Sequence, residues 1–116
     1  MQVRTGVDIV HLPTFERFAQ NPAARKRVFH PSELARDKNE HLAGVFAIKE
    51  SFFKALGKNP RFLDIEVVRG KGKPSVLYPT RYGISSLDVS VSHEKDYCVA
   101  SVVLMMDEKA PREEKR

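Results

Sequence analysis

The chain has 116 residues, of which 41% are hydrophobic and 30% are charged, and its net charge at pH 7 is +5. These values are typical of one globular domain with a modest core, and no apolar stretch is long enough to span a membrane. The N-terminus lacks a basic segment followed by an apolar one, so we expect no signal peptide and a cytoplasmic location without membrane contact.

In the first half of the chain, hydrophobic periodicity predicts one strand followed by several helices. The strand covers residues 2–10 and alternates between an apolar face and a face that carries Gly6 and Asp8. The helices expected after it cover residues 12–19, 23–29, 31–34 and 40–56. Gly57 follows the longest helix as a C-terminal capping signal.

The second half has the alternation and the turn residues of β structure. The expected strands cover residues 64–68, 75–78, 87–91 and 97–104, with a turn at 70–74 and a tight hairpin at 93–96. One strand, then helices, then antiparallel strands is the order of an α+β fold. We therefore expect a single domain over residues 1–105, followed by a charged, disordered tail over residues 106–116.

The longest helix carries charges in two settings. On a helical wheel, Lys49 falls inside a broad apolar arc, whereas Glu50 and Lys54 lie one turn apart on a neighbouring face with small side chains. A surface ion pair would explain Glu50 and Lys54, and Lys49 could extend along apolar neighbours to water. These interpretations remain open when each residue is taken alone.

Asp8 adds a second carboxylate. An Asp near the end of a strand is often a turn former or a cap. Asp8 and Glu50 could instead supply two oxygens to Mg²⁺, which takes one or two protein carboxylates and completes its shell with water and substrate phosphates. Lys49 and Lys54 would then hold further phosphate oxygens.

The order of these residues resembles the paired signature of the 4′-phosphopantetheinyl transferases, G-[VIT]-D followed by [FW]-x-x-K-E-[AS]-x-x-K. Here the two parts are Gly6-Val7-Asp8 and residues 46–54. The opening GVDIV, the helix end KALG, the loop Gly72-Lys73-Pro74 and the segment VSVSH at 89–93 resemble the small subgroup, the holo-acyl-carrier-protein synthases. The resemblance covers residues 3 to about 104.

This resemblance implies a fold with an antiparallel sheet packed against one long helix and short helices. It also implies a reaction, in which coenzyme A donates its phosphopantetheine arm to a serine of an apo acyl carrier protein and 3′,5′-ADP leaves. Asp8 and Glu50 are expected to bind Mg²⁺, which bridges the pyrophosphate of coenzyme A. Lys54 is expected to lie against that pyrophosphate, and Lys49 to support the same site.

Further roles follow from the same resemblance. Ser92 and His93 are expected to contact the nucleotide phosphates, and Lys73 and Pro74 to lie near the adenosine. A base must also take the proton of the acceptor serine, and Glu50 is the candidate, either directly or through a metal-bound water.

The basic residues of the first helices have two interpretations. A solvated face would explain them, whereas the resemblance implies a docking surface for the acidic helix of a carrier protein, with Arg17 and Arg25 in the expected region. The subgroup is generally a homotrimer with active sites in the clefts between subunits, so we expect a homotrimer here.

Two features depart from the subgroup. Val45 stands where Arg is usual, and Arg36, Lys38 or Arg69 could make the interaction with coenzyme A or carrier that such an Arg would provide. The stretch 78–84 is short and contains Pro, where other members have a longer helix. The chemistry proposed for the carboxylates does not depend on either position.

Two other functions are compatible with parts of the sequence. A nucleic-acid-binding module would explain the net charge but not Asp8 and Glu50, and the sequence has no aromatic platform motif or zinc finger. We therefore expect no nucleic-acid partner. A family member that binds coenzyme A or carrier without turnover is the other alternative, motivated by Val45. The single cysteine, Cys98, is expected to be a buried hydrophobe.

Overall fold

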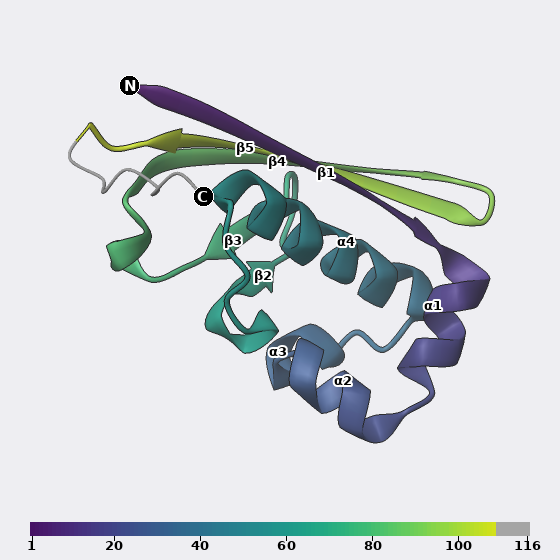
Figure 1. Ribbon diagram of the computed structural model, residues 1–116. Helices are drawn as coiled ribbons and strands as arrows, with labels where there is room; N and C mark the ends of the chain where they lie inside the picture. The colour runs from purple at the N-terminus through teal and green to yellow at the C-terminus, as the bar shows by residue number, and fades with distance from the viewer. Residues whose placement is uncertain (109–116) are drawn as a thin grey trace.

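The structure is a computed structural model that describes residues 1–108 (Figure 1). Residues 109–116 of the expected tail lie outside this part of the chain. The main elements in chain order are β1 (Gln2–His11), α1 (Leu12–Ala19), α2 (Pro22–Val28), α3 (Pro31–Leu34), α4 (Asn39–Leu56), β2 (Glu66–Val68), β3 (Ser75–Leu77), β4 (Ile84–Glu94) and β5 (Tyr97–Met106). Short 3₁₀ turns cover Phe62–Asp64 and Thr80–Tyr82.

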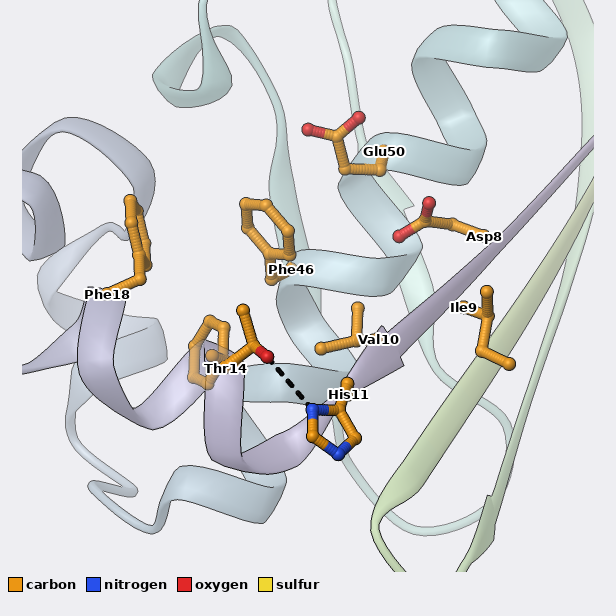
Figure 2. Close-up of a pocket in the computed structure, with 9 residues that line it drawn as sticks. Asp8, Ile9, Val10, His11, Thr14, Phe18, Phe46 and Glu50 are labelled. Atoms are coloured by element: carbon orange, nitrogen blue, oxygen red, sulfur yellow. Dashed lines mark hydrogen bonds between the residues drawn. The ribbon is translucent and has the colours of Figure 1, made fainter.

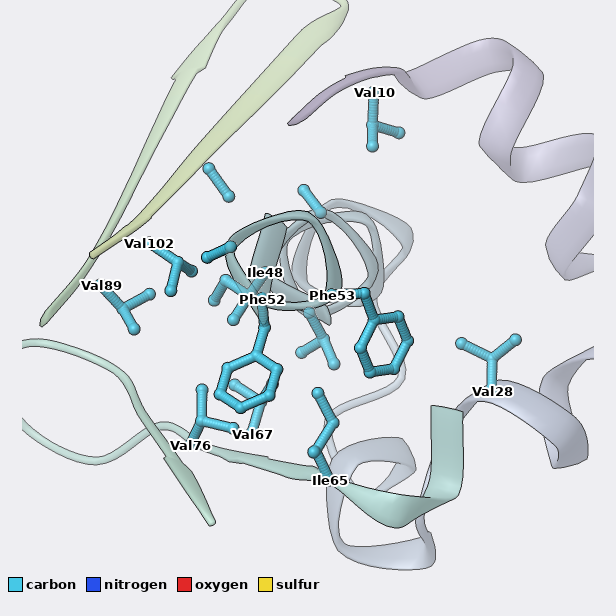
Figure 3. Close-up of a cluster of buried hydrophobic side chains, with 14 of the residues drawn as sticks. Val10, Val28, Ile48, Phe52, Phe53, Ile65, Val67, Val76, Val89 and Val102 are labelled. Carbon is cyan, nitrogen blue, oxygen red and sulfur yellow. The ribbon is translucent and has the colours of Figure 1, made fainter. Parts of the chain in front are cut away.

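The strands form a three-stranded antiparallel sheet in the order β1-β5-β4 and a separate β2-β3 hairpin. Helix α4 lies between the sheet on one side and α1, α2, α3 and the hairpin on the other (Figure 1). In this position it buries side chains around most of its circumference, and the core forms where its Ile48 and Phe52 meet Val89 and Val102 of the sheet and Val67 of the hairpin (Figure 3). The α+β fold expected from the sequence is confirmed.

The close approach of α4 to β1 depends on Gly6. A Cβ atom at this position would lie 2.0 Å from the Ser51 carbonyl oxygen and 2.8 Å from the Ala55 nitrogen, so only glycine fits. The Ser51 hydroxyl lies 2.7 Å from the Ala47 carbonyl oxygen and 3.0 Å from that of Ala100 on β5, which satisfies this buried polar group. The glycine of the Gly6-Val7-Asp8 motif therefore allows the strand that carries Asp8 to pack against the helix that carries Glu50.

Several strand boundaries differ from the prediction. β4 runs from Ile84 to Glu94 and so includes His93 and Glu94, which the sequence pattern assigns to the hairpin turn. The turn itself is Lys95-Asp96, with Lys95 in the left-handed region at φ 51°. Asp64 belongs to a 3₁₀ turn and not to a strand. β5 continues to the buried Met106, one residue beyond the expected domain boundary.

The alternation expected on β1 is present, but its orientation is unusual. Gly6 and Val10 face α4 and are buried, whereas Val3, Val7 and Ile9 lie on the outer face with 58–63% of their surface exposed. The more apolar face of the strand is therefore the uncovered one. Across the described residues, no helix combines the length and apolar character needed to cross a membrane.

Candidate active site

Asp8 and Glu50 come together because β1 packs on α4, and both line one pocket (Figure 2). Lys54, one turn after Glu50, donates hydrogen bonds to Asp8 Oδ1 at 3.2 Å and to the Val7 carbonyl oxygen at 3.0 Å. Within residues 1–108 no ion pair joins Glu50 to Lys54, so the interpretation of these two residues as a surface pair is wrong. Lys54 instead links the helix to the strand beside Asp8.

The charge balance of this cluster favours a bound cation. Burial and then the neighbouring Asp8 carboxylate raise the pKa of Glu50, while Lys54 opposes the shift. Two neighbouring carboxylates, only one of which is paired with an ammonium, repel each other, and a bound Mg²⁺ would relieve this repulsion; Mg²⁺ needs no more than two protein carboxylates. The described residues contain no group of three or more His, Cys, Asp or Glu side chains that could hold a metal.

The pocket beside the carboxylates has a volume of about 440 Å³ and is mainly apolar. Val10, Phe15, Phe18 and Phe46 form its apolar lining, while Asp8 and Glu50 lie at one end (Figure 2). A second hollow of about 320 Å³ shares Phe18 and Phe46 and is lined by Arg27. The arrangement suits a substrate with an anionic group at the carboxylate end and a less polar chain beside it.

Lys49 does not belong to this site, which corrects the sequence prediction. Its side chain is fully buried, and Nζ donates to Glu33 Oε1 at 2.9 Å, to the Val28 carbonyl oxygen at 2.7 Å and to that of Phe62 at 3.2 Å. Glu33 also accepts from the backbone nitrogens of His30 and Val67, at 2.7 Å each. The ion pair thus ties α4 to the segment around α3 and to β2.

No sequence pattern connects Lys49 to Glu33, which lies 16 residues earlier in a short helix. The idea that Lys49 reaches water along apolar neighbours is also wrong, because all three donor positions of its ammonium have interior partners. Burial lowers the pKa of Lys49, and the hydrogen bond to Glu33 opposes this effect.

Ser92 and His93 point to opposite faces of the sheet, because successive residues of a strand alternate. His93 faces α4, where its Cε1 atom would lie 3.8 Å from a Cβ atom on Gly44. Ser92 pairs with Val99 in the row of Ile9 and lies on the outer face. The structure brings His93, but not the Ser92 side chain, to the helix face, so the two side chains cannot act as one pair within a chain.

Lys73 and Pro74 are also apart from the carboxylates. Lys73 Nζ pairs with both carboxylate oxygens of Asp88, at 3.0 and 3.2 Å, on the outer face of β4. This hydrogen bond, followed by the charge of Lys73, lowers the pKa of Asp88. Within one chain, therefore, the loop before β3 does not complete the Asp8–Glu50 site.

The two arginines expected to dock a carrier differ in exposure and in pairing. Arg17 is exposed, whereas Arg25 is paired with Asp37 and donates to the Ala19 carbonyl oxygen at 3.3 Å. Arg27 belongs to the basic region that the sequence indicates, although only Arg17 and Arg25 were singled out there; it is exposed and lines the second hollow. It lies in the same basic segment as Arg25, but only the helix geometry shows which of the two faces the hollow.

Comparison with known proteins gives these features a family context. Residues 4–102 match the 4′-phosphopantetheinyl transferase superfamily. A holo-[acyl-carrier-protein] synthase of Geobacter sp. strain M21 is 40% identical over 86% of this chain and 95% of the relative, and one of Bacillus subtilis is 36% identical over 85% and 92%.

Solved structures of holo-acyl-carrier-protein synthases have a fold similar to that of this chain. A complex of an ACPS with CoA from Chronobacterium ammoniagenes matches with a TM-score of 0.78 and 30% identity, over 93% of this chain and 100% of the other. A Helicobacter pylori holo-[acyl-carrier-protein] synthase in complex with coenzyme A matches with a TM-score of 0.77 and 32% identity, over 87% and 99%. The chain therefore belongs to the 4′-phosphopantetheinyl transferase superfamily. Its named relatives within that superfamily are holo-acyl-carrier-protein synthases, the subgroup that the sequence resembles.

Proposed function

We propose that the protein transfers 4′-phosphopantetheine from coenzyme A to a serine of an apo acyl carrier protein and releases 3′,5′-ADP. The observation that carries this proposal is the placement of Asp8, Glu50 and Lys54 at one end of an apolar pocket, in a chain of this family. In the reaction, the serine oxygen forms a bond to the phosphorus of the phosphopantetheine group. The bond from that phosphorus to the oxygen of the departing 3′,5′-ADP breaks.

The residues present fit Mg²⁺, with Asp8 and Glu50 as its protein ligands. When bound, Mg²⁺ would neutralise negative charge on the pyrophosphate. Lys54 adds an ammonium on the same side and fixes the orientation of Asp8. Glu50 is the proposed acceptor of the serine proton, directly or through a water molecule, and burial, which raises its pKa, makes its carboxylate more basic than an exposed one.

Carrier docking is proposed at α1 and α2. Arg17 and Arg27 are exposed there and would pair with acidic side chains of the carrier, while Arg25 maintains the local fold through Asp37. The apolar pocket lined by Phe18 and Phe46 lies between this surface and the carboxylates, so a carrier bound there would present its serine close to Glu50.

A homotrimer is proposed as the working form. Val3, Val7, Ile9 and Tyr97 are 48–63% exposed on the outer face of the sheet, which is more apolar than a face in contact with water needs to be. Association of copies through this face would cover it, and the number three rests on the family resemblance. A cytoplasmic location is also proposed, and the single free, buried thiol of Cys98 is compatible with it.

The direct test incubates the protein with coenzyme A, Mg²⁺ and several apo carrier proteins, and measures the carriers by mass spectrometry. We expect a mass increase of one phosphopantetheine group on the carrier serine. If no carrier gains this mass while a known transferase modifies the same samples, the proposed function is wrong. Binding of coenzyme A without any adduct would instead identify a family member without turnover.

A further inference from the structure

Lys49 and Glu33 are the only buried charged residues among residues 1–108, and the proposed reaction uses neither of them. Moving two charges out of water costs free energy, and apolar side chains of similar volume in such positions often give a protein that is equally stable or more stable. Stability alone therefore does not explain an ion pair in the core. A buried pair can fix the direction of the groups around it, because hydrogen bonds have a preferred geometry that apolar contacts lack.

The two carbonyl groups that Lys49 binds belong to residues that line the second hollow. Val28 at the end of α2 and Phe62 in the following 3₁₀ turn both contribute to the walls of this space of about 320 Å³. Nζ of Lys49 donates to the Val28 carbonyl oxygen at 2.7 Å and to that of Phe62 at 3.2 Å. One ammonium group thus connects two walls of the hollow to α4.

Both walls depend on contacts of this kind. Helix α2 has seven residues and the 3₁₀ turn has three, and helices this short are not stable by themselves. Val28 is the last residue of α2, where carbonyl oxygens have no partner within the helix. The Phe62 carbonyl oxygen otherwise accepts a long hydrogen bond, 3.4 Å from the Ile65 nitrogen. Lys49 therefore supplies a directional contact that the local structure of either wall does not provide.

The position of Phe62 also affects the apolar surface that leads to the active site. Its ring stacks on Phe46 with the ring centroids 5.7 Å apart, and the Phe46 ring lies 5.8 Å from that of Phe18. Phe18 and Phe46 line both the second hollow and the pocket that contains Asp8 and Glu50. A shift of the 3₁₀ turn would therefore change the surface between α2 and the two carboxylates.

We propose that Lys49, held by Glu33, is a positioning residue for carrier binding, because it fixes the shape of the hollow at which the carrier docks. This inference rests on the proposed function for the identity of the partner. Lys49 lies outside the Asp8–Glu50 site, so it should determine the affinity for the carrier and not the rate of the chemical step.

The first test uses two variants that separate carrier binding from stability. Glu33→Gln leaves a buried ammonium without its counter-ion but keeps the bonds of Lys49 to both carbonyl groups. We expect a lower urea midpoint than that of the wild type and an unchanged affinity for apo acyl carrier protein. Glu33→Gln/Lys49→Met removes both charges with little change in volume. We expect a urea midpoint above that of Glu33→Gln, with a dissociation constant for apo carrier that rises about tenfold, as when an interface loses one well-packed anchor.

Carrier binding is measured by calorimetry without coenzyme A. Ser32→Ala is the control, because it removes a hydrogen bond of 2.6 Å to Glu66 that joins the same two elements, α3 and β2, outside the hollow. It should leave the affinity for apo carrier unchanged. Affinity that falls in step with stability across the variants, or a double variant that binds like the wild type, would overturn the proposal. If the double variant does not fold, weakened carrier binding by Glu33→Gln alone is sufficient to overturn it.

The second test requires no carrier. In the double variant, the amide hydrogens of Phe29 and Ile65, whose bonds lie at the end of α2 and in the 3₁₀ turn, should exchange faster with solvent, while those of β5 keep their rates. Equal changes in all elements would show a general loss of stability and would contradict a role in positioning.

The third test is the transfer assay with the double variant. We expect KM for the carrier to rise by about the same factor as the dissociation constant, with kcat and KM for coenzyme A unchanged. A lower kcat with an unchanged KM for the carrier would contradict the inference alone, since the protein would still be a transferase. A wild type that binds apo carrier, with variants in the expected order, but modifies no carrier would contradict the proposed function alone.

Discussion

Glu50 stands in a setting that disfavours its ionised form, since burial and Asp8 both raise the pKa of its carboxyl. The folded state therefore binds this proton more tightly than the unfolded state does. The ionised carboxylate lowers stability above the folded-state pKa, and this penalty disappears as the pH falls below the unfolded-state value.

Glu50→Gln should accordingly have a higher melting temperature than the wild type at pH 7, and the difference should close below about pH 4. It should also abolish turnover. Thermal unfolding followed by circular dichroism without Mg²⁺ measures the first effect, and Glu94→Gln, at an exposed position, is the control. A Glu50→Gln protein less stable than the wild type at pH 7 would contradict the electrostatic argument.

Asp8→Asn tests the other carboxylate. It keeps the size of the side chain but removes one proposed metal ligand and the charge that pairs with Lys54. We expect carrier modification to be abolished at all Mg²⁺ concentrations, with an unchanged circular dichroism spectrum. Turnover near the wild-type rate would refute the metal assignment.

Lys49 and Lys54 lie five residues apart on one helix, yet the structure gives them different roles. Lys49→Met would leave the Glu33 carboxylate buried without its partner, at a cost of about 3–5 kcal/mol in the free energy of unfolding. Lys54→Met, at a half-exposed position, should cost less than about 1 kcal/mol but should lower turnover strongly. Urea denaturation and the carrier assay distinguish the two. Equal losses of stability would show that the buried pair has no special role.

At the scale of elements, the packing of β1 on α4 depends on one missing side chain. Gly6→Ala places a methyl group 2.0 Å from a backbone oxygen of α4, where no side-chain movement can relieve the clash. We expect a loss of about 3 kcal/mol or more, at the upper end for overpacking. Gly70→Ala is the control, because its methyl group would meet no atom within 4 Å. Similar urea midpoints for the two variants would contradict this account.

The same packing explains what could be predicted from the sequence. Periodicity predicted β1, α1 and α4 because each has a continuous pattern of its own, and the resemblance to the family signature linked Asp8 to Glu50. The ends of β4 could not be found, since Ser92 and Glu94 are polar and extend the strand only because β5 lies beside them. Glu33 could not be predicted as the partner of Lys49, because the pair forms only in the folded chain, between residues that no local pattern connects.

At the scale of the whole molecule, the orientation of β1 is the feature that a single chain leaves unexplained. Its polar side faces the helix because Gly6 and Asp8 are needed there, so its apolar side chains lie on the outer face. With Tyr97 they make that face a surface that water solvates poorly. We therefore expect copies of the chain, or another partner, to cover the outer face.

Val7→Lys tests this conclusion, because Val7 is 58% exposed in the middle of β1 and tolerates a long side chain within the single chain. By analytical ultracentrifugation we expect the wild type to sediment as a trimer and Val7→Lys as a smaller species, because three ammonium groups would be brought into one apolar interface. Leu77→Lys, at a position that is 56% exposed on the separate hairpin, should leave the trimer intact. A wild-type monomer, or a Val7→Lys trimer, would show that the outer face is not the contact between copies.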